Sequence, residues 1–431
     1  MLKKPVMLLM ALLAVSGTFA QRKHSKASAH PSYKGLLMAG YQGWHDTPDD
    51  GANRGWGWYL DKGEFGPGNI KIDLWPELAE YPKMHPTPFK HADGTVAMLP
   101  SDQDYTTTDV RFKWMKQYGV DGVFMQRFIG NTRPGSNRNH FNKVMGDALK
   151  AARKYNRAIA VMYDFSGMRD TADIPLFKSD WKNLVDSLKI TSGGNKQPYL
   201  YHNGKPLVVI WGVGFNDKGR HYTTKTVAKI VDFLQNDPVY GGCSVMLGLP
   251  TYWREFGSDT EKNPELHELI KKVDVIHPWT VGRYHSIDQY DTKYADVMKG
   301  DIAWCKENHV DYAPTCFPGF SWYNLNRLKG AKFNDIPRER GAFFWNQLST
   351  ALKSGAQMLY IAMFDEVDEG TAIMKVSQNP PVGPSPFITF EEGIPSDYYL
   401  YLAGYASKVL KKEVPLPESI PLPKSAQSAI K

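Results

Sequence analysis

The sequence predicts a closed (β/α)8 barrel, a TIM-type barrel with long loops after its strands. Eight short apolar runs recur along the 431-residue chain. Between them lie segments in which apolar residues return with the period of an amphipathic helix. Continuous apolar strands that alternate with helices are typical of parallel strands buried on both faces. An open doubly wound sheet is the alternative, but no G-x-G-x-x-G turn follows the first run.

The eight predicted strands are rich in Val, Ile, Met and Tyr. In chain order they cover residues 35–44, 119–128, 158–167, 206–215, 243–250, 273–282, 311–320 and 356–364. The clearest helical segments are 109–118, 140–155, 223–235, 341–355 and 396–412. Asn203-Gly204 predicts a hairpin turn within 198–211. A long loop rich in Gly, Asp and Trp follows the first strand, over residues 45–70.

Both ends of the chain differ from this pattern. Residues 1–20 have the features of a signal peptide, with a basic start, an apolar run too short to span a bilayer and a cleavage site at Ala20. No Cys suited to lipid anchoring follows, so we expect export to the periplasm or the outside of the cell. We expect residues 21–33 to be a flexible lead, residues 34–413 a single catalytic domain, and residues 414–431 a Pro-rich tail.

Composition excludes several classes of function. The 52 basic residues exceed the 45 acidic ones by only seven, and they are scattered, so nucleic acid is not an expected partner. The three cysteines are too few for a disulfide framework or a zinc site, and the histidines are isolated, so we expect no metal and no cofactor. No later run is long and apolar enough for a membrane span. We expect a monomer.

Aromatic and polar side chains gather where the predicted strands end. The active site of a (β/α)8 barrel lies at these C-terminal ends. Aromatic rings pack on the faces of sugars and polar groups bind their hydroxyls, so the pattern predicts an oligosaccharide or polysaccharide substrate. For any single residue, packing of a long loop is an equal alternative. The predicted binding residues are Tyr41, Trp44, His45, Arg127, Asp164, Trp211, Trp253, Arg254, His277, Trp279, Tyr284, Phe320, Trp322 and Asp365.

The eighth strand ends in the acidic stretch MFDEVDEGT, residues 363–371. If the chain makes a helical turn there, Glu366 and Glu369 have Cβ atoms roughly 5–6 Å apart. Two such carboxylates cannot ionise independently, so an acid and a base coexist near neutral pH. Glycoside cleavage needs that pair, and we predict both glutamates to be catalytic. The alternative is an acid-rich helix start, which the helix dipole favours. We expect Asp368 to point to solvent.

The stretch Phe364–Thr371 resembles the F-N-E-W-x-E-G-T signature of glycoside hydrolase family 99, the endo-α-mannosidases, which are related to family 71. Residues 312–327 and 396–410 are similar to the strand-seven segment and terminal helix of that family. The resemblance implies a (β/α)8 fold and metal-free, retaining hydrolysis of an α-linked, mannose-type glycan. It also implies that Glu366 deprotonates the sugar 2-hydroxyl, which attacks the anomeric carbon, and that Glu369 is the acid and then the base.

The chain departs from this signature at two positions, and three alternatives remain open. Asp365 replaces Asn and Val367 replaces Trp, which bears on the substrate more than on the chemistry. The alternatives are a non-catalytic glycan-binding barrel, a hydrolase of another α-glycan such as α-glucan, and an inverting hydrolase that uses Glu369 with Asp164. Two mutually repelling carboxylates have no use in a binding protein, which disfavours the first. The sugar, its linkage and endo or exo action depend on loops such as 45–70.

Overall fold

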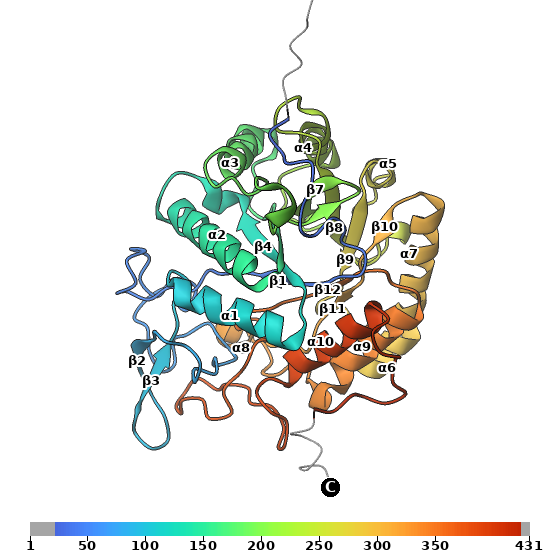
Figure 1. The fold of residues 1–431 in the computed structure, drawn as a ribbon. Coiled ribbons are helices and arrows are strands. Elements are labelled where there is room, and N and C mark those ends of the chain that lie inside the picture. Colours follow the sequence, from blue (N-terminus) through green and yellow to red (C-terminus); the bar gives the residue numbers. More distant parts are fainter. Residues whose placement is uncertain (1–21, 424–431) are drawn as a thin grey trace, which may run out of the picture.

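The computed structural model describes residues 22–423 and forms a barrel of parallel strands (Figure 1). The predicted signal peptide lies outside the described residues. Each of the eight predicted runs contains a strand. The barrel strands are β1 (Leu37–Tyr41), β4 (Gly122–Phe128), β5 (Ala158–Asp164), β7 (Lys205–Trp211), β8 (Ser244–Pro250), β9 (Val275–Trp279), the divided pair β10 (Asp311–Tyr312) and β11 (Thr315–Cys316), and β12 (Leu359–Ile361). The predicted fold class is confirmed.

The barrel closes through its divided seventh strand. β10 pairs in parallel with β9, and β11 pairs in parallel with β12, which in turn pairs with β1. Pro314 separates the two pieces because proline has no N–H to give to a ladder. Hydrogen bonds still cross the gap, from the Ala313 N–H to the Ile276 carbonyl at 2.9 Å and from the Tyr360 N–H to the Pro314 carbonyl at 3.1 Å.

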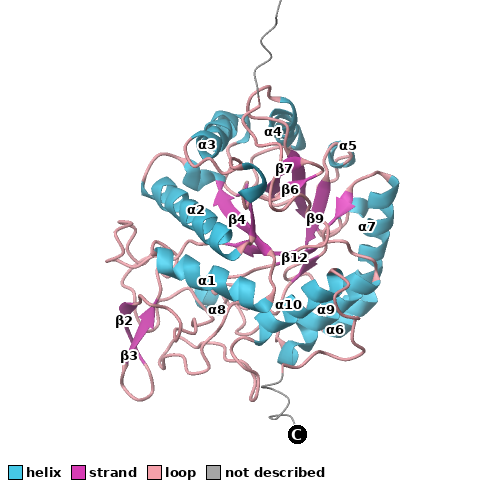
Figure 2. Ribbon diagram, viewed as in Figure 1, coloured by secondary structure: helices cyan, strands magenta, loops and turns pink. Residues whose placement is uncertain are grey.

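Helices surround the strands on the outside (Figure 2). All five predicted helical segments are helices, and the first two begin about one turn earlier than predicted. Several others were not named from the sequence. The helices are α1 (Tyr105–Tyr118), α2 (Ser136–Tyr155), α3 (Ile174–Asp186), α4 (Thr224–Asn236), α5 (Glu265–Ile270), α6 (Ile287–Gln289), α7 (Ala295–Glu307), α8 (Tyr323–Asn326), α9 (Ala342–Lys353) and α10 (Tyr398–Leu410).

Two hairpins accompany the barrel. β6 (Tyr201–His202) pairs antiparallel with β7 through Asn203 and Gly204, whose φ angles are 50° and 72°. Positive φ at both turn residues is what a tight two-residue hairpin requires, so the predicted turn is confirmed. A second hairpin, β2 (His85–Lys90) with β3 (Val96–Leu99), lies in the long connection after β1 and was not predicted.

The described parts of both chain ends pack on the barrel. Within the predicted lead, 21–33, backbone hydrogen bonds join residues 23, 25 and 29 to later parts of the chain. The Lys23 N–H donates to the Val239 carbonyl at 3.0 Å, and the Tyr33 hydroxyl donates to the Leu359 carbonyl at 2.8 Å. In Figure 1 this blue segment crosses in front of the strands. Leu416 and Ile420 of the Pro-rich tail pack, partly buried, against the core.

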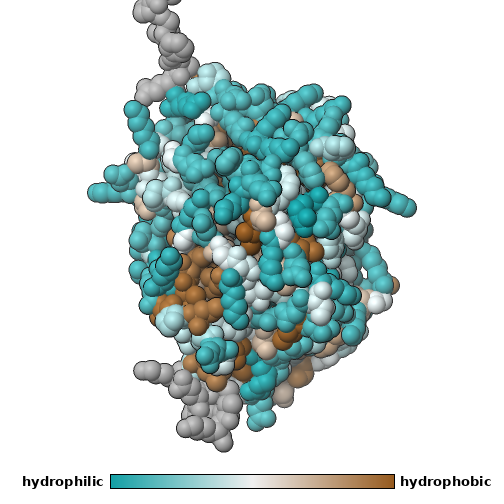
Figure 3. Space-filling view, turned by 90° about the vertical axis from the view of Figure 1, so that its right-hand side faces the viewer, coloured by the Kyte–Doolittle hydropathy of each residue, from teal (hydrophilic) through white to brown (hydrophobic). Residues whose placement is uncertain are grey.

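Among the helices of residues 22–423, none combines the length and apolarity needed to cross a bilayer. The face drawn in Figure 3 is mainly hydrophilic, with separate hydrophobic areas. All three cysteines are buried and unpaired.

Candidate active site

The glutamate pair lies on a tight turn after β12, not on a helical turn. The Glu366 carbonyl accepts the N–H groups of both Thr371 and Ala372, at 3.2 Å each. Gly370 has a φ of 64°, and a Cβ there would lie 2.8 Å from the Ser321 backbone nitrogen. The turn thus needs glycine at this position. The helical geometry that was one premise for pairing the glutamates is absent, but the turn still presents both of them at the C-terminal end of the barrel.

Glu366 is buried at the base of this turn, with 6% of its surface exposed. Its Oε1 accepts a 2.7 Å hydrogen bond from the Gln42 side-chain amide, and Thr371 Oγ1 lies 3.3 Å from its Oε2. Burial raises the pKa of Glu366 well above its usual range, and the nearby charges of Glu369 and Asp368 raise it further. The Gln42 hydrogen bond acts in the opposite direction because it favours the ionised form.

Glu369 is partly exposed and belongs to the same cluster. Burial, and then the charge of Asp368, raises the pKa of Glu369 to about 8. Among the described residues no side chain or backbone group donates a hydrogen bond to its carboxyl group, in contrast to Glu366. The two glutamates therefore cannot both be ionised near neutral pH, and Glu366 is the one whose charge has a hydrogen-bond donor.

Two adjoining cavities meet at Glu369. The inner cavity has a volume of about 240 Å³ and contains Glu366, and the outer cavity has a volume of about 410 Å³. Trp211, Trp279 and Glu369 line both of them. A chain-like ligand that occupied both cavities would therefore pass directly by the Glu369 carboxyl group.

Aromatic rings form much of the cavity walls. Trp44 stacks between Trp58 and Phe128, with ring centroids 4.0 and 5.5 Å away and near-parallel planes. Trp211 and Trp279 meet edge to face at 5.3 Å where the cavities join. Phe320 and Trp322 line the outer cavity, and Trp322 is 40% exposed. Such surfaces fit the apolar faces of sugar rings.

The polar lining of the inner cavity is acidic or neutral. None of the residues that line it is Lys, Arg or His. Besides the two glutamates, its polar side chains are Gln42, Gln126, Asp164 and Ser166. In the described part of the chain, no group of three or more His, Cys, Asp or Glu side chains is placed to hold a metal ion. The amide, hydroxyl and carboxyl groups of the inner cavity can bind the hydroxyls of an uncharged ligand.

Six predicted binding residues line the cavities together with the glutamates. They come from the ends of five different strands, which the barrel brings to one place. They are Trp44, Asp164, Trp211, Trp279, Phe320 and Trp322.

The other predicted binding residues make buried contacts and do not line either cavity. Arg127 makes two hydrogen bonds of 2.5 Å each with Asp180 of α3. Trp253 and Arg254 both donate to Asp301 of α7, at 3.1 and 2.9 Å. The rest are buried within the barrel or against its neighbouring elements, and they are Tyr41, His45, His277, Tyr284 and Asp365.

Strand geometry explains this division. Successive side chains of a strand point to opposite faces, so one residue decides whether a side chain enters the barrel or faces the helices. On β4, Gln126 lines the inner cavity, whereas its neighbour Arg127 reaches α3. The sequence did not single out Gln42, Trp58, Phe128, Ser166 or Met363 as binding residues, although Gln42 stands beside Tyr41, which it did.

The expectation that Asp368 points to solvent is wrong. Its side chain is buried and accepts a 2.7 Å hydrogen bond from the Trp58 indole N–H. Lys71 lies above the same indole, 3.4 Å from the ring centroid. The cause is the loop after β1, which folds back over the turn and donates the Asp73 N–H to the Val367 carbonyl at 2.9 Å.

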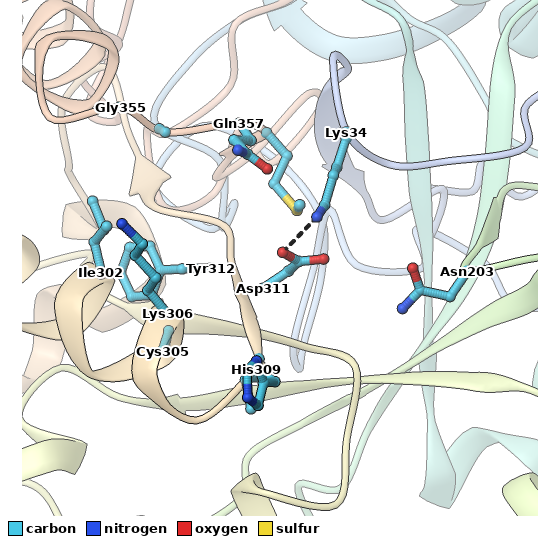
Figure 4. Close-up of a pocket in the computed structure, with 13 residues that line it drawn as sticks. Lys34, Asn203, Ile302, Cys305, Lys306, His309, Asp311, Tyr312, Gly355 and Gln357 are labelled. Carbon is cyan, nitrogen blue, oxygen red and sulfur yellow. Dashed lines mark ion pairs between the residues drawn. The ribbon is translucent and has the colours of Figure 1, made fainter.

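A larger cavity lies at the opposite end of the barrel, and Figure 4 shows residues that line it. It has a volume of about 660 Å³ and is lined by residues that precede or begin strands, including Lys34 and Asp311. These two form an ion pair of 2.8 Å, and His202 lies 3.0 Å from the other Asp311 oxygen. Asp311 is the only carboxylate in this lining, and it is fully engaged. Size alone therefore does not mark the active site.

The fold and the cavities define the class of structure: a parallel barrel with a polar, aromatic site at the C-terminal ends of its strands. Comparison with solved structures finds the family 99 endo-α-mannosidase of Bacteroides thetaiotaomicron, with a TM-score of 0.61 and 14% identity over 88% of this chain and 98% of that one. The same enzyme in complex with bis-tris-propane gives 0.62, with the same identity and coverage. No family model and no curated protein matches the sequence. At this identity the likeness shows a shared fold, in agreement with the resemblance in the sequence.

Proposed function

We propose that the protein is an exported glycoside hydrolase that cleaves an α-linked glycan with retention of configuration. The observation that carries this proposal is the position of the two glutamates. Glu366 lies in the inner cavity, and Glu369 lies where the inner and outer cavities meet. A group at such a junction can protonate the oxygen that links a sugar in one cavity to a sugar in the other.

One hydrogen bond and the position between the cavities assign different roles to the two glutamates. The Gln42 amide stabilises the charge of Glu366, so Glu366 is the base. Glu369 lies where the two cavities meet and can reach the oxygen that links two sugars, so Glu369 is the acid. This is the same assignment that the resemblance to family 99 implies.

In the first step, Glu366 takes the proton of the sugar 2-hydroxyl, and the 2-oxygen attacks the anomeric carbon. The bond to the leaving oxygen breaks as Glu369 gives that oxygen its proton, which leaves a 1,2-anhydro sugar in the inner cavity. In the second step, water attacks the anomeric carbon and loses a proton to Glu369. The 2-oxygen recovers its proton from Glu366, so both glutamates return to their starting states.

The lining of the inner cavity favours an uncharged sugar. No cation lines this cavity, and its carboxyl groups would repel a uronic acid or a sulfated sugar. Together with the resemblance, this favours a mannose-type glycan. An α-glucan is the alternative substrate, but its 2-hydroxyl lies on the same face of the ring as the leaving oxygen, so its cleavage would not proceed through the 1,2-anhydro sugar.

Glycan cleavage by the purified protein, with products identified by mass and linkage, tests the proposal. Glu366→Gln and Glu369→Gln should each lower kcat about 10²–10⁴-fold while glycan binding persists. A wild-type protein that binds glycans but cleaves none would be a binding barrel. NMR detection of the first anomer tests retention, and a β-anomer would point instead to an inverting reaction of Glu369 with Asp164, which lines the same cavity.

A further inference from the structure

Asp365, the residue before Glu366, binds the end of the neighbouring strand. Its Oδ1 accepts the backbone N–H of Gln42 at 2.8 Å, and its Oδ2 accepts that of Gly43 at 2.9 Å. The Asp365 side chain has no exposed surface. One buried carboxylate thus joins the turn after β12 to the C-terminal end of β1.

A buried arginine holds this carboxylate in place. Arg111 of α1 is 1% exposed, and its Nη1 lies 3.2 Å from Asp365 Oδ2 and 2.5 Å from Asp102 Oδ1. Asp102 in turn accepts the backbone N–H of His45 at 2.9 Å. This bridge, Asp365–Arg111–Asp102, therefore fixes backbone groups on both sides of Trp44, which lines the inner cavity.

The bridge uses both oxygens of the Asp365 carboxylate, at the position where the family signature has Asn. The Asp365 carboxylate faces three donors, two backbone N–H groups and one guanidinium N–H. An asparagine has a single acceptor oxygen, and its NH₂ group would face one of those donors. A buried carboxylate is costly without a partner, and Arg111 supplies that partner.

The backbone that Asp365 holds also carries the hydrogen bond to Glu366. The Gln42 side-chain amide donates to Glu366 at 2.7 Å. The other polar atom of that side chain, Oε1, is buried and has no hydrogen-bond partner among the described residues. No second hydrogen bond orients the amide, so its direction depends on the backbone at Gln42.

We propose that Asp365 is a positioning residue, which fixes the backbone at Gln42 and thereby aims the Gln42 amide at Glu366. The inference rests on the proposed role of Glu366 as the base. Asp365 would act through Gln42 and would not itself contact the substrate.

The titration of Glu366 separates positioning from a simple charge effect. The charged or titratable groups that act on Glu366 are Glu369, Asp368, Asp365 and, on β12, Tyr360. The charge of Asp365 raises the pKa of Glu366, whereas the Gln42 hydrogen bond lowers it and has the larger effect. If Asp365→Asn only removed the charge of Asp365, the pKa of Glu366 would fall. If it also broke the hydrogen bond from Gln42 to Glu366, the pKa of Glu366 would rise.

The test compares Asp365→Asn with a matched control, Asp121→Asn. Asp121 is also buried and accepts a backbone N–H of β1, that of Leu37 at 2.9 Å, but at the opposite end of the strand. We expect Asp365→Asn to lower kcat about 10–100-fold with little change in KM, and Asp121→Asn to lose stability with kcat unchanged. Carbon-13 NMR of the glutamate carboxyls, with Glu366 assigned by its Gln variant, should show a raised pKa in Asp365→Asn and in Gln42→Ala.

An unchanged kcat in Asp365→Asn, or a lowered pKa of Glu366, would overturn the inference. If the wild-type protein cleaves no glycan, the proposed function fails, but the NMR titration still tests the positioning. If Asp365→Asn does not fold, hydrogen exchange of the backbone amides in the wild-type protein tests whether Asp365 holds the backbone at Gln42 and Gly43. Gln42 and Gly43 should exchange as slowly as the interior of β1, and exchange as fast as in the loop over 45–70 would contradict the bridge.

Discussion

Replacing Glu369 by Gln should stabilise the protein at neutral and alkaline pH while removing its activity. The pKa of Glu369 is raised from 4.5 to about 8, so the folded state keeps a proton that the unfolded state releases above its own pKa. The stability that this proton provides is complete below about pH 4.5 and is lost as the pH rises through 8. At 1.36 kcal/mol per pH unit, the free energy of unfolding falls by at most about 3 kcal/mol between pH 4.5 and pH 7. Because Glu369 is partly exposed, we expect about 1–2 kcal/mol.

Urea unfolding of the wild-type protein and of Glu369→Gln at pH 4.5 and pH 8 measures this difference. The glutamine keeps the shape of the side chain but cannot ionise, so the variant should lack this contribution to the fall of stability between the two pH values. The two proteins should be nearly equally stable at pH 4.5, and the variant more stable at pH 8. Equal stability at both pH values, or a less stable variant at pH 8, would refute the assignment of a raised pKa to Glu369.

Three further predictions address neighbouring groups. Asp368→Asn removes the charge that raises the pKa of Glu369, so the alkaline limb of the pH–rate profile should move to lower pH; an unmoved limb contradicts the coupling. Trp322→Ala should raise KM severalfold for a glycan that fills the outer cavity, and leave a short activated glycoside unaffected. Gly370→Ala should lower the free energy of unfolding by about 1–3 kcal/mol, because the positive φ and the contact with Ser321 leave no room for a methyl group. Urea denaturation measures this difference, and a variant as stable as the wild-type protein would contradict the prediction.

Much of the architecture follows from the sequence because it depends on local patterns. Each of the eight apolar runs contains a strand, since strands buried on both faces must be apolar throughout. The Asn203-Gly204 turn follows from the two positive φ angles that these residues accept. The sequence also directs attention to Glu366 and Glu369, because acidic residues at the end of a core strand are unusual.

Only the tertiary structure decided which strand-end side chains share a cavity. Arg127 and Gln126 are neighbours in the chain, yet they point to opposite faces of β4, one to α3 and the other to the inner cavity. Trp58 and Asp368 are far apart in the sequence, and their hydrogen bond exists because the loop after β1 folds back over the turn after β12. Local patterns specify strands and turns, but the surroundings of a side chain come from distant segments. For that reason the crowded carboxylates could be recognised in the sequence, whereas two supporting residues could be recognised only in the fold. Gln42 donates a hydrogen bond to Glu366, and Arg111 forms an ion pair with Asp365, the residue before Glu366.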